Sequence, residues 1–211
     1  MNRLYYLFDP LCGWCYGAGP VLALLSQRGG DQPQLLPSGL FAGEGARPMD
    51  DAFAAYAWSN DQRIERLTGQ PFSALYRSQV LDNHERMFDS GPATVALTAV
   101  ALTAPQREAE ALKAIQHARY VDGLDNTAIP VLLALLRGLG LEEAAARLAA
   151  PDVALMEAYS ARTAQAQQLM RALGAQGVPS FVLEHDGQRQ LLNASTAFSN
   201  PEAFADQWLA A

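Results

Sequence analysis

The two cysteines of this chain, Cys12 and Cys15, lie where an apolar strand gives way to a helix. Residues 4–8 (Leu-Tyr-Tyr-Leu-Phe) form a short unbroken apolar run, which is typical of a central strand covered on both faces. Asp9-Pro10 ends the run, since a proline cannot donate to a strand ladder. Beyond Cys12, apolar residues recur at intervals of three and four, which is the period of a helix. This junction predicts an α/β fold in which a buried strand feeds a helix that begins at Cys12.

A cysteine pair at this spacing is compatible with few structures. A disulfide framework is excluded, because it would use more cysteines at wider spacings. A zinc site needs four ligands, and His84, His117 and His185 lie far apart with no partner at helical spacing. Zinc binding and a chance pair of buried cysteines stay open as less favoured alternatives. The strand–CxxC–helix context favours a redox-active pair.

The position of the pair predicts different roles for its two members. The first N–H groups of a helix lack intrahelical partners and lie at the positive end of its dipole, so a thiolate there is stabilised. Cys12, at the outer end, is predicted to be the exposed nucleophile. Cys15, one turn further in, is predicted to be the shielded thiol that resolves a mixed disulfide. Asp9 is predicted to stabilise the turn, although its charge would disfavour a thiolate on Cys12 if the two lay close together.

The rest of the sequence alternates strand signals with a long helical block. Residues 34–41 have strand character, and their internal proline indicates an end or a bend. From about residue 49 to residue 175, the composition and periodicity are helical, with Gly- and Pro-containing breaks. Residues 180–184 and 189–192 flank Asp186-Gly187, which favours a tight hairpin. Asn200-Pro201 is predicted to open a last helix, and Pro20 to kink the first one.

Charge and hydropathy argue against two classes of partner. The net charge is −7, and the fifteen basic residues, all arginine except Lys113, are scattered along the chain. No basic stripe is therefore available for nucleic acid or for an anionic membrane surface. The longest apolar run, residues 93–104, falls short of the ~20 residues that a membrane-spanning helix needs. The first residues contain no signal-peptide pattern, and we therefore expect a cytoplasmic protein.

Two longer motifs connect the chain to a known family. Residues 8–17 are Phe-Asp-Pro-Leu-Cys-Gly-Trp-Cys-Tyr-Gly, and residues 177–182 are Gly-Val-Pro-Ser-Phe-Val. With both, the chain resembles the DsbA-like family of the thioredoxin superfamily, in particular its predicted cytoplasmic protein-disulfide isomerases and FrnE-type proteins. The resemblance implies an α/β thioredoxin fold, with a mixed central sheet, that carries a large all-helical insertion domain. It places the thioredoxin-fold domain at residues 1–45 and 152–211 and the insertion at residues 46–151.

The same resemblance implies which residues accompany the cysteines. Pro179 is expected to follow a cis peptide bond beside the pair, so that the backbone of Val178 can bind an extended substrate, strand against strand. Trp14 is expected either to form an apolar rim for client peptides or to pack over the start of the helix. The dipeptide Gly13-Trp14 lacks the histidine of the family's periplasmic oxidases, which implies a less oxidising protein.

These features predict a thiol–disulfide oxidoreductase that reduces or isomerises the disulfides of client proteins or peptides through a mixed disulfide. In a reducing cytosol, either activity is favoured over net oxidation. We expect no metal and no bound cofactor other than the redox-active Cys12–Cys15 disulfide, with glutathione as an optional redox partner. The sequence does not indicate an oligomeric state.

Two other functions stay open at this point. One is a glutathione-dependent activity like that of kappa-class glutathione transferases and 2-hydroxychromene-2-carboxylate isomerases. Those proteins tend to carry serine where Cys12 stands, and the intact pair counts against this alternative. The other is a client-binding chaperone module in which both thiols are dispensable.

Overall fold

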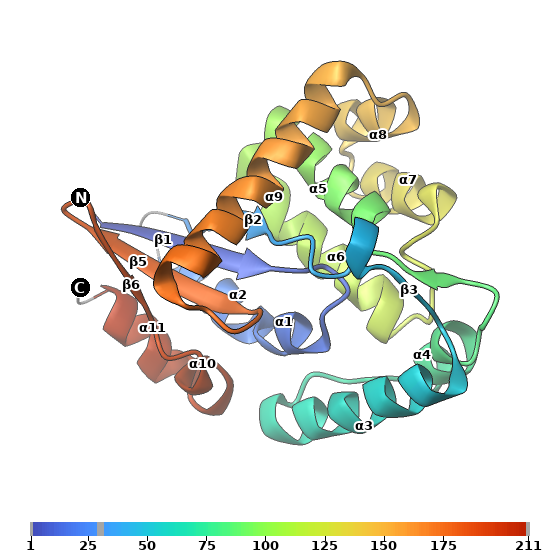
Figure 1. The fold of residues 1–211 in the computed structure, drawn as a ribbon, viewed down its shortest axis with the longest axis horizontal. Coiled ribbons are helices and arrows are strands. Elements are labelled where there is room, and N and C mark those ends of the chain that lie inside the picture. Colours follow the sequence, from blue (N-terminus) through green and yellow to red (C-terminus); the bar gives the residue numbers. More distant parts are fainter. Residues whose placement is uncertain (1, 29–31, 210–211) are drawn as a thin grey trace.

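A computed structural model describes residues 2–28 and 32–209, and within them a four-stranded mixed sheet forms the centre of one half of the molecule (Figure 1). Its strands lie in the order β2 (Gln34–Pro37), β1 (Asn2–Phe8), β5 (Ser180–His185) and β6 (Gln188–Leu191). β1 runs parallel to β2 and antiparallel to β5, and β5 and β6 form an antiparallel hairpin. The chain therefore leaves the sheet after β2 and returns to it more than a hundred residues later.

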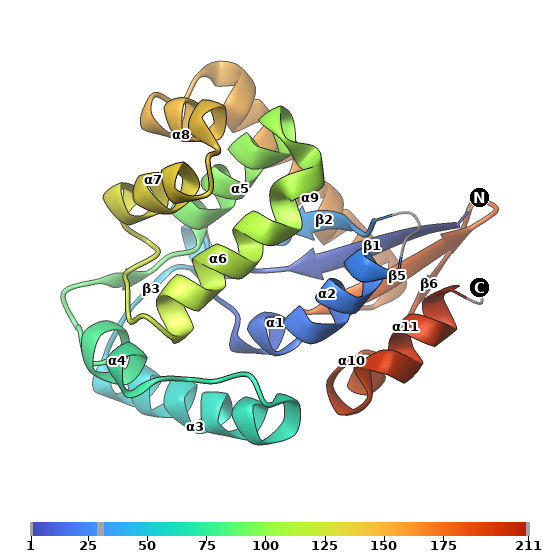
Figure 2. The same cartoon turned by 180° about the vertical axis from the view of Figure 1, so that it is seen from behind.

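The first apolar run is the central strand of this sheet, and both of its faces are covered. Leu4, Tyr6 and Phe8 belong to one core cluster together with side chains of α2 (Gly19–Gln27) and α11 (Pro201–Leu209). Tyr5 and Leu7 point the other way and pack against α9 (Val153–Leu173), which crosses the opposite face (Figure 1; Figure 2). Fully burying one such side chain contributes about 1.5–3 kcal/mol, so both faces of β1 stabilise the fold.

The segment between β2 and α9 is almost entirely helical. Helix α5 lies in its centre and packs against α6, α8 and α9. Its buried positions are mostly small residues on all sides, which is the pattern of a helix enclosed by others. The elements of this segment are α3 (Asp51–Thr68), α4 (Ala74–Tyr76), η2 (Arg77–Leu81), α5 (Gly91–Thr103), η3 (Pro105–Arg107), α6 (Glu108–Tyr120), α7 (Ile129–Gly138) and α8 (Glu142–Ala149).

Several local predictions are confirmed. The first helix is divided into α1 (Gly13–Gly17) and α2, with the break at Ala18, just before Pro20. Asp186 and Gly187 both have positive φ, 48° and 79°, as a two-residue hairpin turn requires. The last helix, α11, begins at Pro201 as expected.

Other local predictions need correction. The second strand ends at Pro37 instead of continuing to residue 41. Ser38 still donates its N–H to Phe8 O at 2.7 Å, in line with the parallel pairing, and Gly39 then adopts a φ of 64°, which turns the chain out of the ladder. The structure also contains short elements that the sequence did not indicate. They are η1 (Gly43–Gly45), α10 (Ser195–Ser199), and a two-stranded sheet of β3 (Arg47–Pro48) and β4 (Met87–Phe88).

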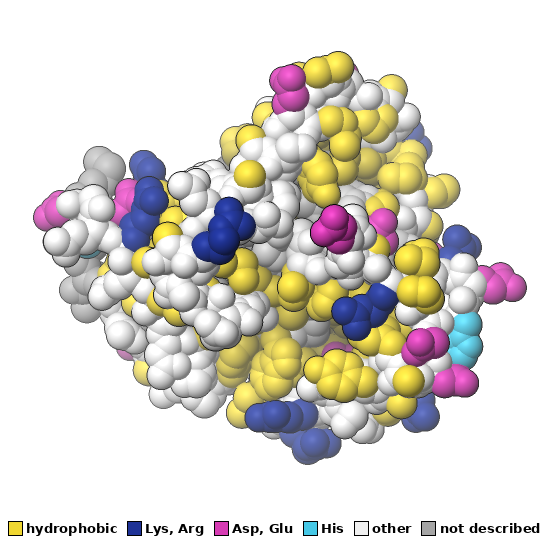
Figure 3. Space-filling view, in the orientation of Figure 1, with side chains coloured by type: hydrophobic (Ala, Val, Ile, Leu, Met, Phe, Trp, Pro, Cys, Tyr) yellow, Lys and Arg dark blue, Asp and Glu magenta, His cyan; other side chains and the backbone are white. Residues whose placement is uncertain are grey.

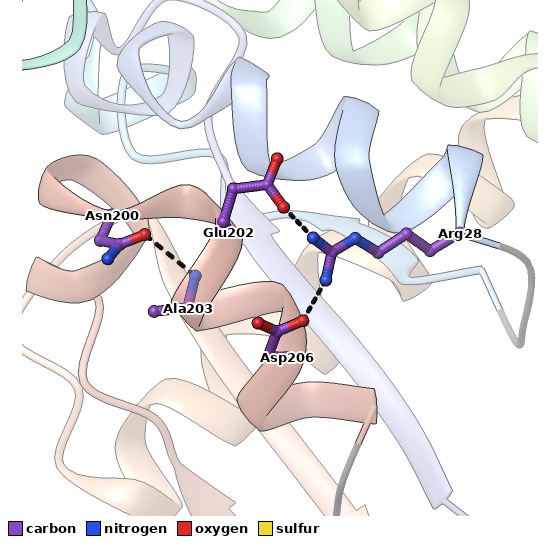
Figure 4. Close-up of polar contacts among 5 residues, drawn as sticks. All are labelled: Arg28, Asn200, Glu202, Ala203 and Asp206. Carbon is purple, nitrogen blue, oxygen red and sulfur yellow. Dashed lines mark hydrogen bonds and ion pairs between the residues drawn. The ribbon is translucent and has the colours of Figure 1, made fainter.

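Ion pairs fix α11 against α2. Arg28, at the C-terminal end of α2, pairs with Glu202 and Asp206, which lie one turn apart on α11 (Figure 4). Asn200 caps α11 by accepting the N–H of Ala203 at 3.0 Å. Both carboxylates are exposed, so each pair adds at most about 1 kcal/mol. The buried residues Phe204, Ala205 and Trp208 of α11 belong to the core cluster that contains α2 and one face of β1.

A partly buried arginine connects the sheet to the helical segment. Arg162 of α9 donates to Leu35 O of β2 at 2.8 Å and to Thr98 Oγ1 of α5 at 3.1 Å, and it pairs with Glu108 of α6. Burial raises the pKa of Glu108 from 4.5 to about 7, against the opposing charge and hydrogen bond of Arg162. One guanidinium group thus joins four elements.

Glu108 should make the stability of the protein depend on pH. Its pKa is raised in the folded protein, so the folded chain retains a proton that the unfolded chain loses as the pH rises from about 4.5 to about 7. The stability that this group contributes is complete below pH 4.5, and it is lost through that interval. We expect Glu108→Gln to reduce the fall in unfolding free energy between pH 5 and 7, by at most about 1.4 kcal/mol per pH unit. Urea unfolding at several pH values measures this, with the exposed Glu157→Gln as the control. Equal pH slopes in Glu108→Gln and wild type would contradict the prediction.

Candidate functional site

The cysteine pair lies at the carboxyl end of the central strand, where β1 passes through a short turn into α1 (Figure 1). Cys12 donates its N–H to Asp9 O at 3.1 Å, which closes the turn. Cys12 occupies the N-cap position of α1, with extended backbone, and its carbonyl accepts the N–H of Tyr16 at 3.0 Å. The helix start predicted from the sequence is therefore confirmed, with Cys12 at its outer end and Cys15 in its first turn.

The two thiols differ in their surroundings. Cys12 is 8% exposed, whereas Cys15 is completely inaccessible to solvent. The Cys15 sulfur accepts the N–H of Asp9 at 3.5 Å, and its carbonyl accepts the hydroxyl of Tyr6 at 3.1 Å. Burial, together with the neighbouring Cys12, raises the pKa of the Cys15 thiol well above its usual range. Cys12 is therefore also buried, contrary to the exposed nucleophile predicted from the sequence, because Val178 covers its sulfur. It is nevertheless the only one of the two thiols that has any exposed surface.

The Gly-Val-Pro segment lies against the outer thiol. The Val178–Pro179 peptide bond is cis, as the sequence resemblance implied. The Cys12 Sγ lies 3.6 Å from Val178 O, although 166 positions separate the two residues in the sequence. Pro179 directly precedes β5, so Val178 continues the line of that strand towards Cys12. The structure therefore brings the CxxC motif and the Gly-Val-Pro motif together.

Trp14 packs over the start of the helix and also stays partly exposed. Its ring makes an edge contact with Phe198 of α10, at 5.2 Å between centroids. The guanidinium group of Arg63, from α3, lies 5.5 Å from the centroid of the Trp14 ring. Of the two roles expected for Trp14, packing is thus observed. Part of the Trp14 side chain stays exposed to solvent, so packing does not prevent it from contacting a client.

Asp9 stabilises the turn, as predicted. Its side chain is fully buried, and Oδ1 accepts the N–H of Leu11 at 2.9 Å. Oδ2 accepts the N–H of Phe41 at 3.1 Å and the hydroxyl of Ser90 at 2.7 Å. Burial raises the pKa of Asp9, and these three hydrogen bonds oppose the rise. The charge of Asp9 contributes to raising the pKa of Cys15, the inner thiol.

The helical segment also supplies residues to this site, and sequence reasoning missed them. Tyr120 of α6 donates its hydroxyl to Leu11 O at 2.7 Å, next to Cys12. Gln70, after α3, donates its amide to Tyr16 O at 3.1 Å. Asp61 of α3 is buried against Gly13, which follows Cys12 in the sequence. No spacing rule relates these positions to residues 12–15, since each reaches the site only through tertiary packing, such as that of α3 on α1.

An aromatic cluster adjoins the turn that holds Cys12. Phe53 of α3 and Phe41 both contact Phe88, at centroid distances of 4.9 and 4.7 Å, and the exposed Tyr56 lies 6.4 Å from Phe53. The backbone of Phe41 is bound to Asp9, so the cluster lies beside the turn that holds Cys12. Figure 3 shows hydrophobic side chains gathered across the middle of this face, between α3 and α9. The surface near Cys12 therefore offers apolar contacts.

Each histidine lies beside a carboxylate: His84 with Asp51, His117 with Asp122 and His185 with Asp186. Within residues 2–28 and 32–209, no group of three or more His, Cys, Asp or Glu side chains is placed to hold a metal ion. In the same part of the chain, no helix combines the length and the apolar character needed to span a membrane.

Comparisons with known proteins identify a family and several similar solved structures. The family model described as "DSBA-like thioredoxin domain" matches residues 4–207. The solved structure of the cytosolic disulfide reductase DsbM from Pseudomonas aeruginosa is similar over 99% of this chain and 97% of its own, with 36% identity and a TM-score of 0.88. The structure of DsbM with GSH (glutathione) is similar over 99% of this chain and all of its own, with 34% identity and a TM-score of 0.86. A search of curated proteins returned no match.

Two more distant structures share the fold. A protein from Nitrosomonas europaea, assigned as a protein disulfide isomerase, matches 99% of this chain and 96% of its own, with 24% identity and a TM-score of 0.77. A 2-hydroxychromene-2-carboxylate isomerase matches 97% of this chain and 95% of its own, with 18% identity and a TM-score of 0.60. The fold class inferred from the sequence, a thioredoxin fold with a mixed sheet and a helical insertion, is confirmed.

Burial predicts different accessibility of the two thiols. In the reduced native protein, a small alkylating reagent such as iodoacetamide should modify Cys12 at least about tenfold faster than Cys15, which is inaccessible and has a raised pKa. Fragmentation mass spectrometry of the tryptic peptide that carries both cysteines locates the modification. In 6 M urea, the difference should disappear. Equal rates in the native protein would show that Cys15 is not shielded.

The Asp9 contacts predict a graded loss of stability. In Asp9→Asn, the new NH₂ group must face the N–H of either Leu11 or Phe41, so one buried donor loses its acceptor. We expect a cost of about 1–3 kcal/mol in the free energy of unfolding, measured by urea denaturation. Ser90→Ala removes a single hydrogen bond to the same carboxylate, so it should cost less, about 1 kcal/mol. The opposite order would contradict this role of Asp9.

Proposed function

Because this chain belongs to the family of DSBA-like thioredoxin domains, we propose that it reduces disulfides in client proteins or peptides through the Cys12–Cys15 pair. It is a thiol–disulfide oxidoreductase of this family. The proposal rests above all on the contact between Cys12 Sγ and Val178 O, at 3.6 Å. This contact holds the accessible thiol beside a stretch of backbone that an extended peptide can pair with, and Cys15 lies buried directly behind it.

The reaction proceeds in two exchanges. The Cys12 thiolate attacks one sulfur of a client disulfide, so a Cys12–client bond forms and the other client sulfur leaves as a thiolate that takes up a proton. Cys15 then loses its proton and attacks the Cys12 sulfur, which releases the second client thiol. The client has gained two electrons and two protons, and the protein is left with a Cys12–Cys15 disulfide. In the reduced protein, the raised pKa of Cys15 keeps this thiol protonated, which leaves Cys12 as the sulfur that attacks first.

A thiol reductant must return the pair to the reduced state, and we infer that it is glutathione. Two glutathione molecules reduce the Cys12–Cys15 disulfide and leave as glutathione disulfide, so the electrons balance. The similarity to DsbM, of which a structure with glutathione exists, supports this choice, and its description as a cytosolic reductase supports reduction in the cytoplasm as the direction. The Gly13-Trp14 dipeptide, which contains no histidine, fits the same direction.

We infer that clients bind along Val178 and Pro179 and across the apolar surface nearby. The Val178 backbone would pair with an extended segment of the client. Trp14 and the aromatic cluster of Phe41, Phe53 and Tyr56 would contact its apolar side chains. Unfolded or partly unfolded polypeptides, which expose both backbone and apolar side chains, fit this surface best.

Trapping of the mixed disulfide tests the mechanism. Without Cys15, a client disulfide attacked by Cys12 cannot be released, so Cys15→Ser should accumulate covalent adducts with an unfolded disulfide-containing protein such as denatured ribonuclease A. The adducts should appear on non-reducing gels and disappear with dithiothreitol. The matched variant Cys12→Ser should give none, since the remaining thiol is buried.

Other outcomes would support the alternative functions. If neither variant forms adducts and both retain full client binding, the thiols are dispensable and the protein acts as a chaperone module. If Cys15→Ser retains wild-type turnover with glutathione and a small electrophile, the glutathione-dependent alternative is supported. Either result would overturn the dithiol mechanism.

A further inference from the structure

Asp61 reaches the dipeptide between the two cysteines from the helical segment. It lies in the middle of α3 and is 4% exposed. A side chain at position 13 would place its Cβ on top of Asp61 Oδ1 and 3.2 Å from the Ile64 side chain. Only glycine therefore fits at position 13 while Asp61 occupies this place. The carboxylate thus lies directly against the residue that follows Cys12.

Few groups compensate the charge of Asp61. Its Oδ2 accepts the hydroxyl of Tyr76 at 2.9 Å. The guanidinium group of Arg119, 1% exposed, lies 5.5 Å from the centre of the Tyr76 ring and donates to Asn126 Oδ1 at 3.3 Å. Arg119 lowers the pKa of Asp61 through its charge, but burial is the larger effect and raises that pKa from 3.8 to about 7.

A charge on Asp61 also reaches the space around Cys12. The Tyr120 hydroxyl, which is bound to Leu11 O, lies close enough to both Asp61 and Cys12 for each of them to raise the pKa of Tyr120. A thiolate on Cys12 and a carboxylate on Asp61 are therefore two negative charges beside the same buried side chain. Like charges at this range disfavour each other.

We propose that Asp61 is a positioning residue that makes the Cys12–Cys15 couple more reducing, because its carboxylate opposes the thiolate of the reduced protein. This inference rests on the proposed dithiol function. A couple whose reduced form is stabilised is a strong oxidant, so a group that destabilises the thiolate shifts the equilibrium towards the disulfide and makes the reduced protein a better donor of electrons.

The effect should depend on pH. Below about pH 6, Asp61 is mostly protonated and exerts little repulsion, whereas above about pH 8 it is ionised. The reducing power of the protein should therefore rise more steeply with pH than that of a variant without this carboxyl. The titratable or charged groups around Asp61 are Tyr76 of α4, which donates to it, and Arg119 and Tyr120 of α6. Gly13, against which Asp61 lies, directly follows Cys12, the N-cap residue of α1.

The equilibrium with glutathione tests the proposal. The protein is incubated in buffers of varied ratio of reduced to oxidised glutathione, and the dithiol fraction is measured after acid quenching and alkylation. At pH 8, Asp61→Asn should increase the equilibrium constant for reduction of the protein disulfide by about tenfold, equivalent to about 30 mV for a two-electron couple. At pH 5.5, variant and wild type should agree within about twofold. Asp51→Asn, the same change at the exposed start of α3, should match wild type at both pH values.

A second variant keeps the test independent of any structural disturbance in Asp61→Asn. Tyr76→Phe retains the carboxyl but removes the hydrogen bond that stabilises its ionised form, so the pKa of Asp61 should rise. We therefore compare Tyr76→Phe with the double variant that carries both Tyr76→Phe and Asp61→Asn. The equilibrium constants of these two proteins should diverge at a pH about one unit higher than those of wild type and Asp61→Asn. Structural damage alone would not shift that pH.

Two results would count against the inference in different ways. If the wild-type pair titrates normally with glutathione and Asp61→Asn has the same equilibrium constant at pH 8, Asp61 does not tune the couple and the proposal is wrong. If the wild-type pair shows no reversible equilibrium with glutathione at all, the proposed dithiol function itself fails.

Discussion

The buried carboxylate of Asp9 is the interaction on which the architecture of the site depends. It binds the N–H of Leu11 in the turn after β1, the N–H of Phe41 after β2, and the hydroxyl of Ser90 just before α5. Three segments that are distant in sequence thereby meet at one group without a counterion among the described residues. Hydrogen bonds to a charged acceptor are stronger than neutral ones, so they hold the turn that presents Cys12.

The helical segment takes part in the site as well as covering it. Arg162 joins the edge strand β2 to α5 and α6, which fixes the direction of α6. Because α6 is fixed, the Tyr120 hydroxyl meets Leu11 O, and α3 brings Asp61 against Gly13. The cysteines belong to the strand–helix unit, whereas part of the polar surroundings of that unit comes from the other half of the molecule. A change in helix packing would therefore alter the surroundings of the thiols.

The parts of the site that could be predicted are those encoded locally. The strand at residues 4–8, the helix start at Cys12 and the hairpin at Asp186-Gly187 each depend on neighbouring residues, so their patterns were sufficient. The end of β2 was predicted wrongly because the apolar residues 40–41 resemble a continued strand, whereas Gly39 adopts a positive φ that turns the chain out of the ladder. The cis bond at Pro179 followed from family resemblance alone. The domain boundaries at residues 45/46 and 151/152, and the roles of the site residues, stay predictions.

By itself, the sequence determined the chemistry: one thiol pair, three positions apart, at the junction of a buried strand and a helix. Only the tertiary structure decided what surrounds that pair. Val178, Tyr120 and Asp61 lie between 48 and 166 positions from the cysteine-motif residues that they contact. Such proximity depends on how helices and strands pack, and no local pattern records it. The physical reason is that backbone patterns are short-range, whereas burial and electrostatics act between any groups that folding brings together.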